Sequence, residues 1–417
     1  MRYWFGSVPS GWKAIKLKFL CKQNLEKTSS KSNYVGLENI ESNTSTYIAS
    51  NIVPSGENIK FSKGDILFGK LRPYLAKVWR AEFDGCCSSE FFVLTAKEIN
   101  PDYLKLVLIS PSFIELVNGS TFGAKMPRSN WEFVGDQFIP VPPLEMQRCI
   151  AYFVAKSTLN IDALSKISQS KLELLSSYRQ SLITRAVTKG LDPNVAMKNC
   201  CISRVDTIPQ KWNVATLKHV CWIRARLGWK GLKAEEYTKS GYGFLSAFNI
   251  QSNKLLWENL NYISKQRYDE SPEIKLSVGD VLLVKDGAGI GKTAYIDNLP
   301  IEATTNSSLA VVTPNKNLDY KYLYYYFNST PFKSLVDEVL NGMGVPHLTQ
   351  ENLNNLKIPI PQIEEQKSIV EFLDNKNEKL LKIEKSIVQT INRLTEYRSS
   401  LISAAVTGQL AIDEAAE

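Results

Sequence analysis

The feature of this sequence that most constrains its fold is an internal duplication. Residues 139–191 (IPVPPLEMQ to AVTKGL) align without a gap with residues 358–410 (IPIPQIEEQ to AVTGQL), at an offset of 219 positions. Nine of the last fourteen aligned positions are identical, from Tyr178 and Tyr397 onward. A duplication at a fixed offset indicates two copies of one structural unit. The sequence therefore predicts two similar halves that perform two similar tasks.

The segments that precede these two tails also correspond, although more loosely. The pairs are 8–18 with 208–218, 61–70 with 276–285, 88–95 with 306–313 and 118–127 with 339–349. A variable domain of ordinary size, followed by a near-constant tail, therefore occurs twice. We expect a first variable domain at 1–138, a first spacer segment at 139–191, a second variable domain at 192–357, a second spacer segment at 358–410 and a C-terminal tail at 411–417.

Composition limits the class of protein. Hydrophobic residues make up 44% of the chain and charged residues 22%, which is ordinary for a globular protein. No apolar run reaches the length of a membrane helix, and the N-terminus lacks the apolar core of a secretory signal. Seven cysteines, two pairs of them vicinal, make a poor disulfide framework, so we expect a cytoplasmic protein. The net charge of +8 favours a polyanionic partner, though weakly.

Both tails are expected to be long helices. Neither contains Gly or Pro between Glu145 and Thr188 or between Glu364 and Thr407, so each can form one helix of about 40 residues, roughly 60 Å long. Apolar residues at heptad spacing, flanked by polar ones, are typical of a coiled-coil seam. The predicted interface residues are Ile150, Val154, Ile161, Leu164, Leu175, Tyr178, Leu182, Ile369, Leu373, Leu380, Ile383, Ile387, Leu394, Tyr397 and Leu401.

A half-buried helix of this length needs a partner, and the other tail is the natural one. Two tails related by duplication can pack antiparallel about a pseudo-twofold axis. The alternative is that each helix packs on its own domain as ordinary core, but a narrow seam suits a helix pair better.

Each variable domain shows signals for both strands and helices. Short apolar runs at 66–68, 91–94, 281–284 and 309–312 follow turn residues and predict strands. Asn100 and Asn317 are expected to cap helices that run through 105–109 and 322–327. The predicted fold class is α+β, with two similar mixed α/β domains separated by two long helices that form an antiparallel coiled coil.

Basic and aromatic residues gather in the expected loops, where Arg and Lys can hold phosphates or pair with guanine edges. The alternative for each is a solvated surface side chain whose stem covers apolar area. The candidate DNA-binding residues are Lys70, Arg72, Tyr74, Lys77, Lys125 and Arg128 in the first domain, and Arg224, Arg226, Lys230, Lys285, Lys292 and His347 in the second.

No catalytic motif is complete in this sequence. The segment DGAGIGKT at 286–293 lacks a Walker A motif, because Asp286 stands where the first Gly is needed. Asn100-Pro101-Asp102-Tyr103 differs by one residue from an amino-methyltransferase NPPY motif and is better explained as a helix start. With two histidines and no C-x-x-C spacing, neither a metal site nor a nucleophilic triad is expected.

With these features, the chain resembles the specificity subunits of type I restriction–modification enzymes. The resemblance rests on Glu145 and Gln147, the matching Glu364 and Gln366, the repeated helix ends YRQSLITRAVTKGL and YRSSLISAAVTGQL, the KGD and VGD turns at 63–65 and 278–280, and the GIGK loop at 289–292. It covers essentially the whole chain. The GIGK loop has no full counterpart in the first domain, where LRPYLAK stands instead.

This resemblance implies a mechanism. Each variable domain would be a target recognition domain that reads one half of a bipartite, asymmetric DNA sequence, and the helices would set the unread spacer. Two modification subunits, which use S-adenosylmethionine, would dock on the chain and methylate adenines. Restriction subunits, which use ATP and Mg²⁺, would join them. The chain itself would hold no cofactor and no catalytic residue. Two other functions remain open: a coiled-coil scaffold that never touches DNA, and a degenerate DNA methyltransferase or nuclease.

Overall fold

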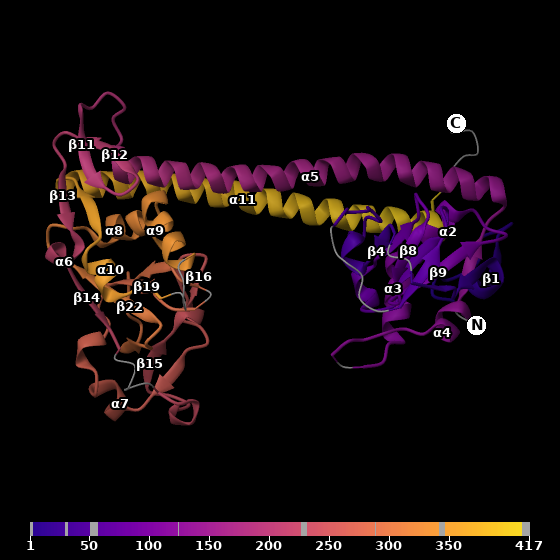
Figure 1. Cartoon of the computed structure of the whole chain (residues 1–417), viewed down its shortest axis with the longest axis horizontal. Coiled ribbons are helices and arrows are strands. Elements are labelled where there is room, and N and C mark those ends of the chain that lie inside the picture. The colour runs from indigo at the N-terminus through magenta and orange to yellow at the C-terminus, as the bar shows by residue number, and fades with distance from the viewer. Residues whose placement is uncertain are drawn as a thin grey trace. The chain divides into compact units, whose positions relative to one another are not determined.

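The computed structural model describes residues 3–29, 32–50, 57–123, 125–226, 232–287, 289–341 and 347–410. The chain forms two compact units: the first is Met1–Ser170 with Ile387–Glu417, and the second is Lys171–Ser386. Each unit thus contains one variable domain, the start of the long helix that follows it and the end of the long helix from the other repeat (Figure 1). No helix in the described part of the chain is long and apolar enough to cross a membrane.

The first variable domain is built on two small sheets. One is antiparallel with the order β2-β9-β6-β7, and the other has the order β3-β5-β8-β4 with β4 and β8 parallel. Apolar residues of α2 and α3 pack against the first sheet in the main core. The elements are β1 (Lys13–Lys16), α1 (Leu17–Leu20), β2 (Cys21–Asn24), β3 (Lys27–Thr28), β4 (Tyr34–Val35), η1 (Leu37–Asn39), β5 (Asn58–Phe61), β6 (Ile66–Gly69), η2 (Pro73–Leu75), β7 (Val78–Arg80), β8 (Gly85–Ser88), β9 (Phe91–Ala96), α2 (Pro101–Ile109), α3 (Pro111–Gly119), α4 (Trp131–Gly135) and β10 (Phe138–Val141).

The second variable domain repeats this plan. Its main sheet has the order β14-β22-β19-β20, which matches β2-β9-β6-β7 strand for strand. A hairpin, β11 with β12, precedes it. The elements are β11 (Met197–Ile202), β12 (Val205–Pro209), β13 (Asn213–Thr216), α6 (Leu217–Val220), β14 (Cys221–Ala225), η4 (Ala234–Glu236), β15 (Tyr242–Leu245), η5 (Ala247–Asn249), β16 (Ile250–Gln251), β17 (Lys254–Leu255), β18 (Asn261–Ile263), α7 (Lys265–Asp269), η6 (Pro272–Ile274), β19 (Val281–Val284), β20 (Thr293–Tyr295), β21 (Ala303–Thr305), β22 (Leu309–Pro314), α8 (Tyr320–Phe327), α9 (Thr330–Leu340), α10 (Gln350–Asn354) and β23 (Lys357–Ile360). The predicted α+β class is confirmed.

The repeated KGD and VGD turns owe their sequence to one hydrogen-bonding pattern. Gly64 and Gly279 adopt positive φ angles of 95° and 92°, which a side chain would strain. The next residue, Asp65 or Asp280, accepts a bond from the backbone N–H at the start of the turn, at 2.9 Å and 2.8 Å. The other oxygen of Asp65 accepts from the hydroxyl of Thr95 in β9, at 2.7 Å. Asp280 is likewise hydrogen-bonded to the hydroxyl of Thr313 in β22. The carboxylate therefore joins each turn to the neighbouring strand.

The helix caps agree with the prediction in one domain and correct it in the other. The side chain of Asn100 accepts hydrogen bonds from the first free backbone N–H groups of α2, as expected. In the second domain the cap is Asp319, not Asn317, because α8 begins at Tyr320. Asp319 is the residue that aligns with Asn100 at the offset of 219, so the duplication was a better guide than the preference for Asn.

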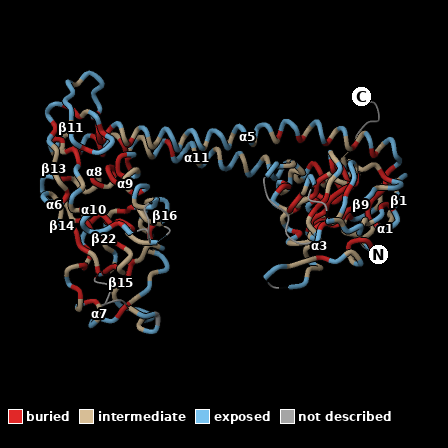
Figure 2. Tube along the Cα trace, in the orientation of Figure 1, coloured by how far each residue is buried: buried red, intermediate tan, exposed pale blue. Residues whose placement is uncertain are grey.

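Both tails form the long helices that the sequence predicts, α5 (Leu144–Lys189) and α11 (Ile363–Val406). They lie antiparallel in each unit. In the first unit Nε of Arg398 lies 2.8 Å from Oδ1 of Asp162, and in the second Nη2 of Arg179 lies 2.7 Å from Oε2 of Glu384. Away from the domains the helix pair exposes most of its residues (Figure 2).

The contact stripe of these helices is shifted from part of the prediction. Four predicted interface residues are exposed, namely Leu164, Tyr178, Ile383 and Tyr397. The residues one position later are half-buried instead, and they include Arg179, Glu384 and Arg398. Of the apolar set spaced by seven in α11, Leu373, Leu380 and Leu401 are buried, and Ile387 and Leu394 are half-buried. The other contact row of each helix therefore lies four positions after the heptad-spaced apolar row, whereas the sequence predicted three positions. Part of this row is ionic, because it includes Arg179, Glu384 and Arg398.

Candidate nucleic-acid interface

Three loops of the first domain meet beyond the end of β6. The backbone N–H of Lys70 donates to the carbonyl of Glu90, at 2.9 Å, and the N–H of Ser129 donates to the carbonyl of Lys70, at 3.0 Å. The N–H of Arg72 donates to the carbonyl of Pro127, at 2.7 Å. Backbone hydrogen bonds thus fix the loop after β6, the turn before β9 and the loop that precedes α4 as one surface. We call this surface the first loop frame.

The first loop frame presents cationic and aromatic side chains. Arg72 is exposed and sits at a left-handed φ of 50°, a strained conformation that often marks functional sites. Tyr74 and Lys125 are exposed, as the sequence led us to expect. Phe122 and Met126 are exposed beside them and were missed, because a lone apolar residue in a loop carries no sequence signal. Cations with exposed aromatic faces suit phosphates and bases.

Two predicted residues of this domain have structural partners. The Nζ atom of Lys77 donates to the carbonyls of Leu37 and Ile40, at 2.7 Å each, and burial lowers its pKa. Lys77 therefore fastens a loop, and we remove it from the candidate set. Lys70 is half-buried, and its ammonium lies 5.9 Å from the ring centroid of Phe92.

Arg128 is held by a carboxylate. Its Nε atom lies 3.2 Å and 3.1 Å from the two carboxylate oxygens of Glu90, and its Nη2 atom lies 2.9 Å from Oε1. No local sequence pattern marks Glu90, since its role appears only when two distant loops meet. This contact fixes the plane of the guanidinium.

The second domain repeats the frame with other side chains. The N–H of Lys285 donates to the carbonyl of Ser308, and the N–H of Leu348 donates to the carbonyl of Lys285, both at 2.9 Å. Lys285 and Leu348 thus take the places of Lys70 and Ser129. Gly291, at a φ of 86°, lies against Val336, where an added Cβ would come within 3.0 Å. We call these segments the second loop frame.

An acidic side chain again sits among the basic ones. The Nζ atom of Lys285 donates to Oδ2 of Asp286, at 2.7 Å, and Oδ1 of Asp286 is hydrogen-bonded to Nδ1 of His347. Partial burial alone would raise the pKa of Asp286, but the bonds from Lys285 and His347 outweigh it and lower the pKa. Lys292 and His347 are exposed.

Two other predicted residues are buried, which corrects the sequence analysis. Arg224 is 6% exposed, and its Nη2 atom lies 3.0 Å from Oδ2 of Asp280, which is fully buried. Arg226 is also buried, and its Nε atom donates to the carbonyl of Thr305, at 3.1 Å. Arg224 lies in β14 and Arg226 directly follows it, and their side chains bind a buried carboxylate and a backbone carbonyl inside the domain. Lys230 lies outside the described residues.

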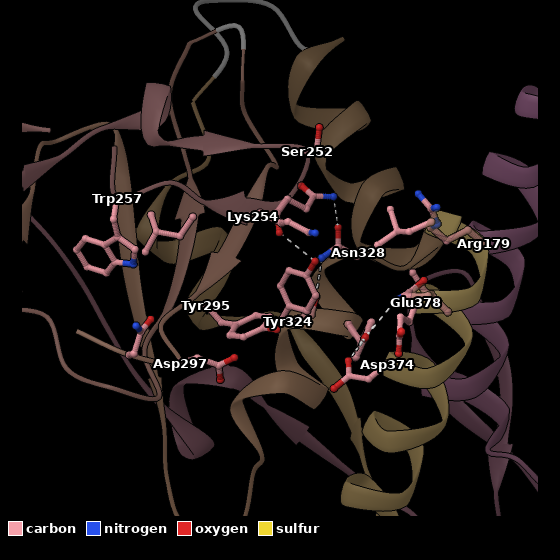
Figure 3. A pocket seen from close by; sticks show the side chains of 17 residues that line it. Arg179, Ser252, Lys254, Trp257, Tyr295, Asp297, Tyr324, Asn328, Asp374 and Glu378 are labelled. Carbon is pink, nitrogen blue, oxygen red and sulfur yellow. Dashed lines mark hydrogen bonds between the residues drawn. The ribbon is translucent and has the colours of Figure 1, made fainter. Parts of the chain in front are cut away.

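The second unit also contains an open pocket of about 500 Å³ (Figure 3). Its polar side chains bind one another: the hydroxyl of Tyr325 is hydrogen-bonded to Asp374, and Nδ2 of Asn377 donates to the hydroxyl of Tyr325, at 3.1 Å. A cavity of about 550 Å³ lies at the equivalent place of the first unit. There Leu106 and Ala155 align with Tyr325 and Asp374, so the two cavities share little chemistry.

Among the described residues no cluster of three or more His, Cys, Asp or Glu could hold a metal ion.

Comparison with known proteins gives a consistent result. Residues 9–174 and 209–393 match the type I restriction modification DNA specificity domain. The specificity subunit of type I restriction enzyme MjaVIII, from Methanocaldococcus jannaschii, is 24% identical over 79% of this chain and 75% of its own length. That of EcoBI, from Escherichia coli, is 21% identical over 91% of this chain and 80% of its own.

Solved structures share the fold. A chain from a study of complex assembly and conformational transition of the type I restriction–modification system has a TM-score of 0.75, at 20% identity, over 97% of this chain and all of that one. The HsdS subunit from Thermoanaerobacter tengcongensis has a TM-score of 0.51, at 21% identity, over 97% of this chain and 98% of its own.

Proposed function

The chain belongs to the family of type I restriction–modification specificity subunits, and on that premise we propose how its domains divide the recognition of DNA. Each variable domain reads one half of a bipartite, asymmetric target through its loop frame. The observation that carries this proposal is that the two frames share two equivalent backbone hydrogen bonds, at Lys70 and at Lys285, while the surrounding side chains differ. One scaffold with two sets of side chains suits two unlike half-sites, since base contacts specify and backbone contacts position.

The proposed contacts fall into two groups. The exposed cations Arg72, Lys125 and Lys292 hold phosphates, and Tyr74 and Phe122 add exposed aromatic surface to the first frame. Lys70, Arg128, Lys285 and His347 are anchored in the frames. A net charge of +8 adds a sequence-independent attraction to the phosphate backbone.

We propose that α5 and α11 set the number of unread base pairs. Readers of two major-groove half-sites must be spaced by about one helical turn of DNA, roughly 34–36 Å, or a multiple of it. Helices of 46 and 44 residues that pair antiparallel in each unit are stiff enough for this task, whereas a flexible linker is not.

The chemistry is assigned to partner subunits. We propose that two modification subunits, carrying S-adenosylmethionine, dock on the chain and methylate adenine, and that restriction subunits with ATP and Mg²⁺ join them in the cytoplasm. Support comes from large apolar side chains that the long helices leave exposed, such as Leu159 and Leu174, because exposed apolar surface marks protein contacts. In this proposal the chain contributes no catalytic residue.

Domain exchange tests this function. The chain is co-expressed with its modification subunits, and methylated motifs are mapped across the host genome. Replacing residues 1–138 with the first domain of a relative should change one half-site and leave the other half-site and the spacer unchanged. A motif that changes in both halves, or no DNA retention by the assembled complex, would contradict the proposal.

A further inference from the structure

Arg128 and His347 occupy equivalent positions in the two loop frames. Arg128 forms an antiparallel bridge with Leu71, and His347 forms one with Asp286, at the matching point of the duplication. The following residue in each case, Ser129 or Leu348, donates its N–H to the carbonyl of the frame lysine. Both side chains are partly exposed, Arg128 to 36% and His347 to 44%. The duplication thus places a polar side chain at the same point of each surface.

Both side chains are also oriented by a carboxylate. Glu90 accepts from the Nε and Nη2 atoms of Arg128, so these contacts leave the Nη1 edge of the guanidinium for another ligand. Asp286, itself fixed by Lys285, takes the Nδ1 side of His347. With Asp286 bound at Nδ1, the neutral tautomer that carries its proton on Nδ1 has Nε2 as a hydrogen-bond acceptor.

An oriented side chain differs from a mobile one in what it can recognise. Lys125 and Lys292 are exposed and suit phosphates, which accept a cation from many directions. A base edge demands a defined direction, and a side chain that is already fixed loses less conformational entropy on binding. The carboxylate partners therefore distinguish Arg128 and His347 from the exposed Lys125 and Lys292.

We propose that Arg128 and His347 are specificity-determining residues at the equivalent position of the two half-sites. Arg128 binds the O6 and N7 acceptors of a guanine, and His347 accepts at Nε2 from an exocyclic amino group, the N6 of adenine or the N4 of cytosine. Glu90 and Asp286 are positioning residues. This inference rests on the proposed DNA-reading function of the domains.

The test combines protein variants with base analogues, using the full chain assembled with its modification subunits. Binding to the mapped target is measured with 7-deazaguanine at each guanine of the first half-site, and with amino-deleted bases at each adenine and cytosine of the second. At one position in each half-site, the analogue should weaken wild-type binding by about 5- to 150-fold. The same analogue should have no effect on Arg128→Ala or His347→Ala, respectively.

The controls separate reading from folding and from general affinity. Glu90→Gln and Asp286→Asn should reduce discrimination at the same two positions. Lys125→Ala and Lys292→Ala should weaken binding to every sequence alike and lower the salt dependence, with the motif unchanged. Unfolding midpoints of the variants within 2 °C of wild type would exclude misfolding as the cause.

Several outcomes would overturn the inference. One is that Arg128→Ala or His347→Ala lowers affinity equally for all bases. Another is that 7-deazaguanine, rather than an amino-deleted base, couples to His347, because the ring would then donate instead of accept. If the wild-type complex did not bind the target motif found by methylation mapping, the proposed function itself would be refuted. The failure of the inference and the failure of the proposed function can therefore be told apart.

Discussion

The hydroxyl oxygen of Tyr322 lies 3.1 Å from the backbone carbonyl oxygen of Val187 and 3.0 Å from that of Pro359. The second domain is therefore fastened to the end of the helix that follows the first domain. Tyr103 repeats the arrangement in the first unit, 2.8 Å from the carbonyl of Pro140 and 3.4 Å from that of Val406. Each variable domain thus binds the C-terminal end of the long helix from the other repeat: the first domain binds the end of α11, and the second binds the end of α5.

Loss of the Tyr322 hydroxyl tests how much this exchange contributes to stability. We expect Tyr322→Phe to lower the free energy of unfolding of the full chain by about 1–3 kcal/mol, because two buried carbonyls lose a donor. Urea unfolding followed by circular dichroism measures the change. Tyr397→Phe is the matched control, because Tyr397 is 61% exposed and its loss should have little effect. Equal midpoints for the two variants would contradict the assignment.

The register of the helix pair can be tested with two apolar residues of α11. Leu380→Ala should cost about 2–4 kcal/mol of stability, because Leu380 is 6% exposed. Ile383→Ala should cost under about 1 kcal/mol, because Ile383 is 47% exposed despite its heptad spacing. Thermal unfolding of both variants gives the comparison. A larger loss of stability for Ile383→Ala than for Leu380→Ala would support the contact stripe predicted from the sequence alone.

Burial of Arg224 predicts a defect in stability rather than in recognition. We expect Arg224→Ala to destabilise the chain by about 3–5 kcal/mol, because it leaves the fully buried carboxylate of Asp280 without its cation. Calorimetry and DNA binding are measured on the same preparation, with Lys292→Ala as the surface control. Should Arg224→Ala bind DNA more weakly while unfolding at the wild-type midpoint, the residue belongs at the interface after all.

Helix length predicts the spacer of the DNA target. Insertion of one heptad after Ser170 in α5 and one after Ser386 in α11 adds about 10 Å to each helix, equivalent to about three base pairs. The mapped methylation motif should gain unread base pairs, and both half-sites should stay as they were. An altered half-site with the original spacer would contradict the ruler function.

Local patterns explain why the helices were predicted well and their contact stripe was not. Both long helices, α5 and α11, lack Gly and Pro, which is a property of neighbouring residues alone. The residue three positions after Leu380 is the apolar Ile383, and the residue four positions after it is the charged Glu384. The hydrophobic pattern therefore predicted Ile383 as the interface residue. The partner helix decides between them, because Arg179 lies across from Glu384 at 2.7 Å.

By itself, the sequence determined the duplication, the two long helices, the paired turns and the loops that carry basic residues, since each of these depends on residues close together in the chain or on direct alignment of the repeats. The tertiary structure alone decided which helix end completes which domain, which arginines are buried and which carboxylate orients Arg128 or His347. These contacts join residues 38 to 303 positions apart, and no local propensity encodes them. They arise only when burial and hydrogen bonding are satisfied across the whole fold.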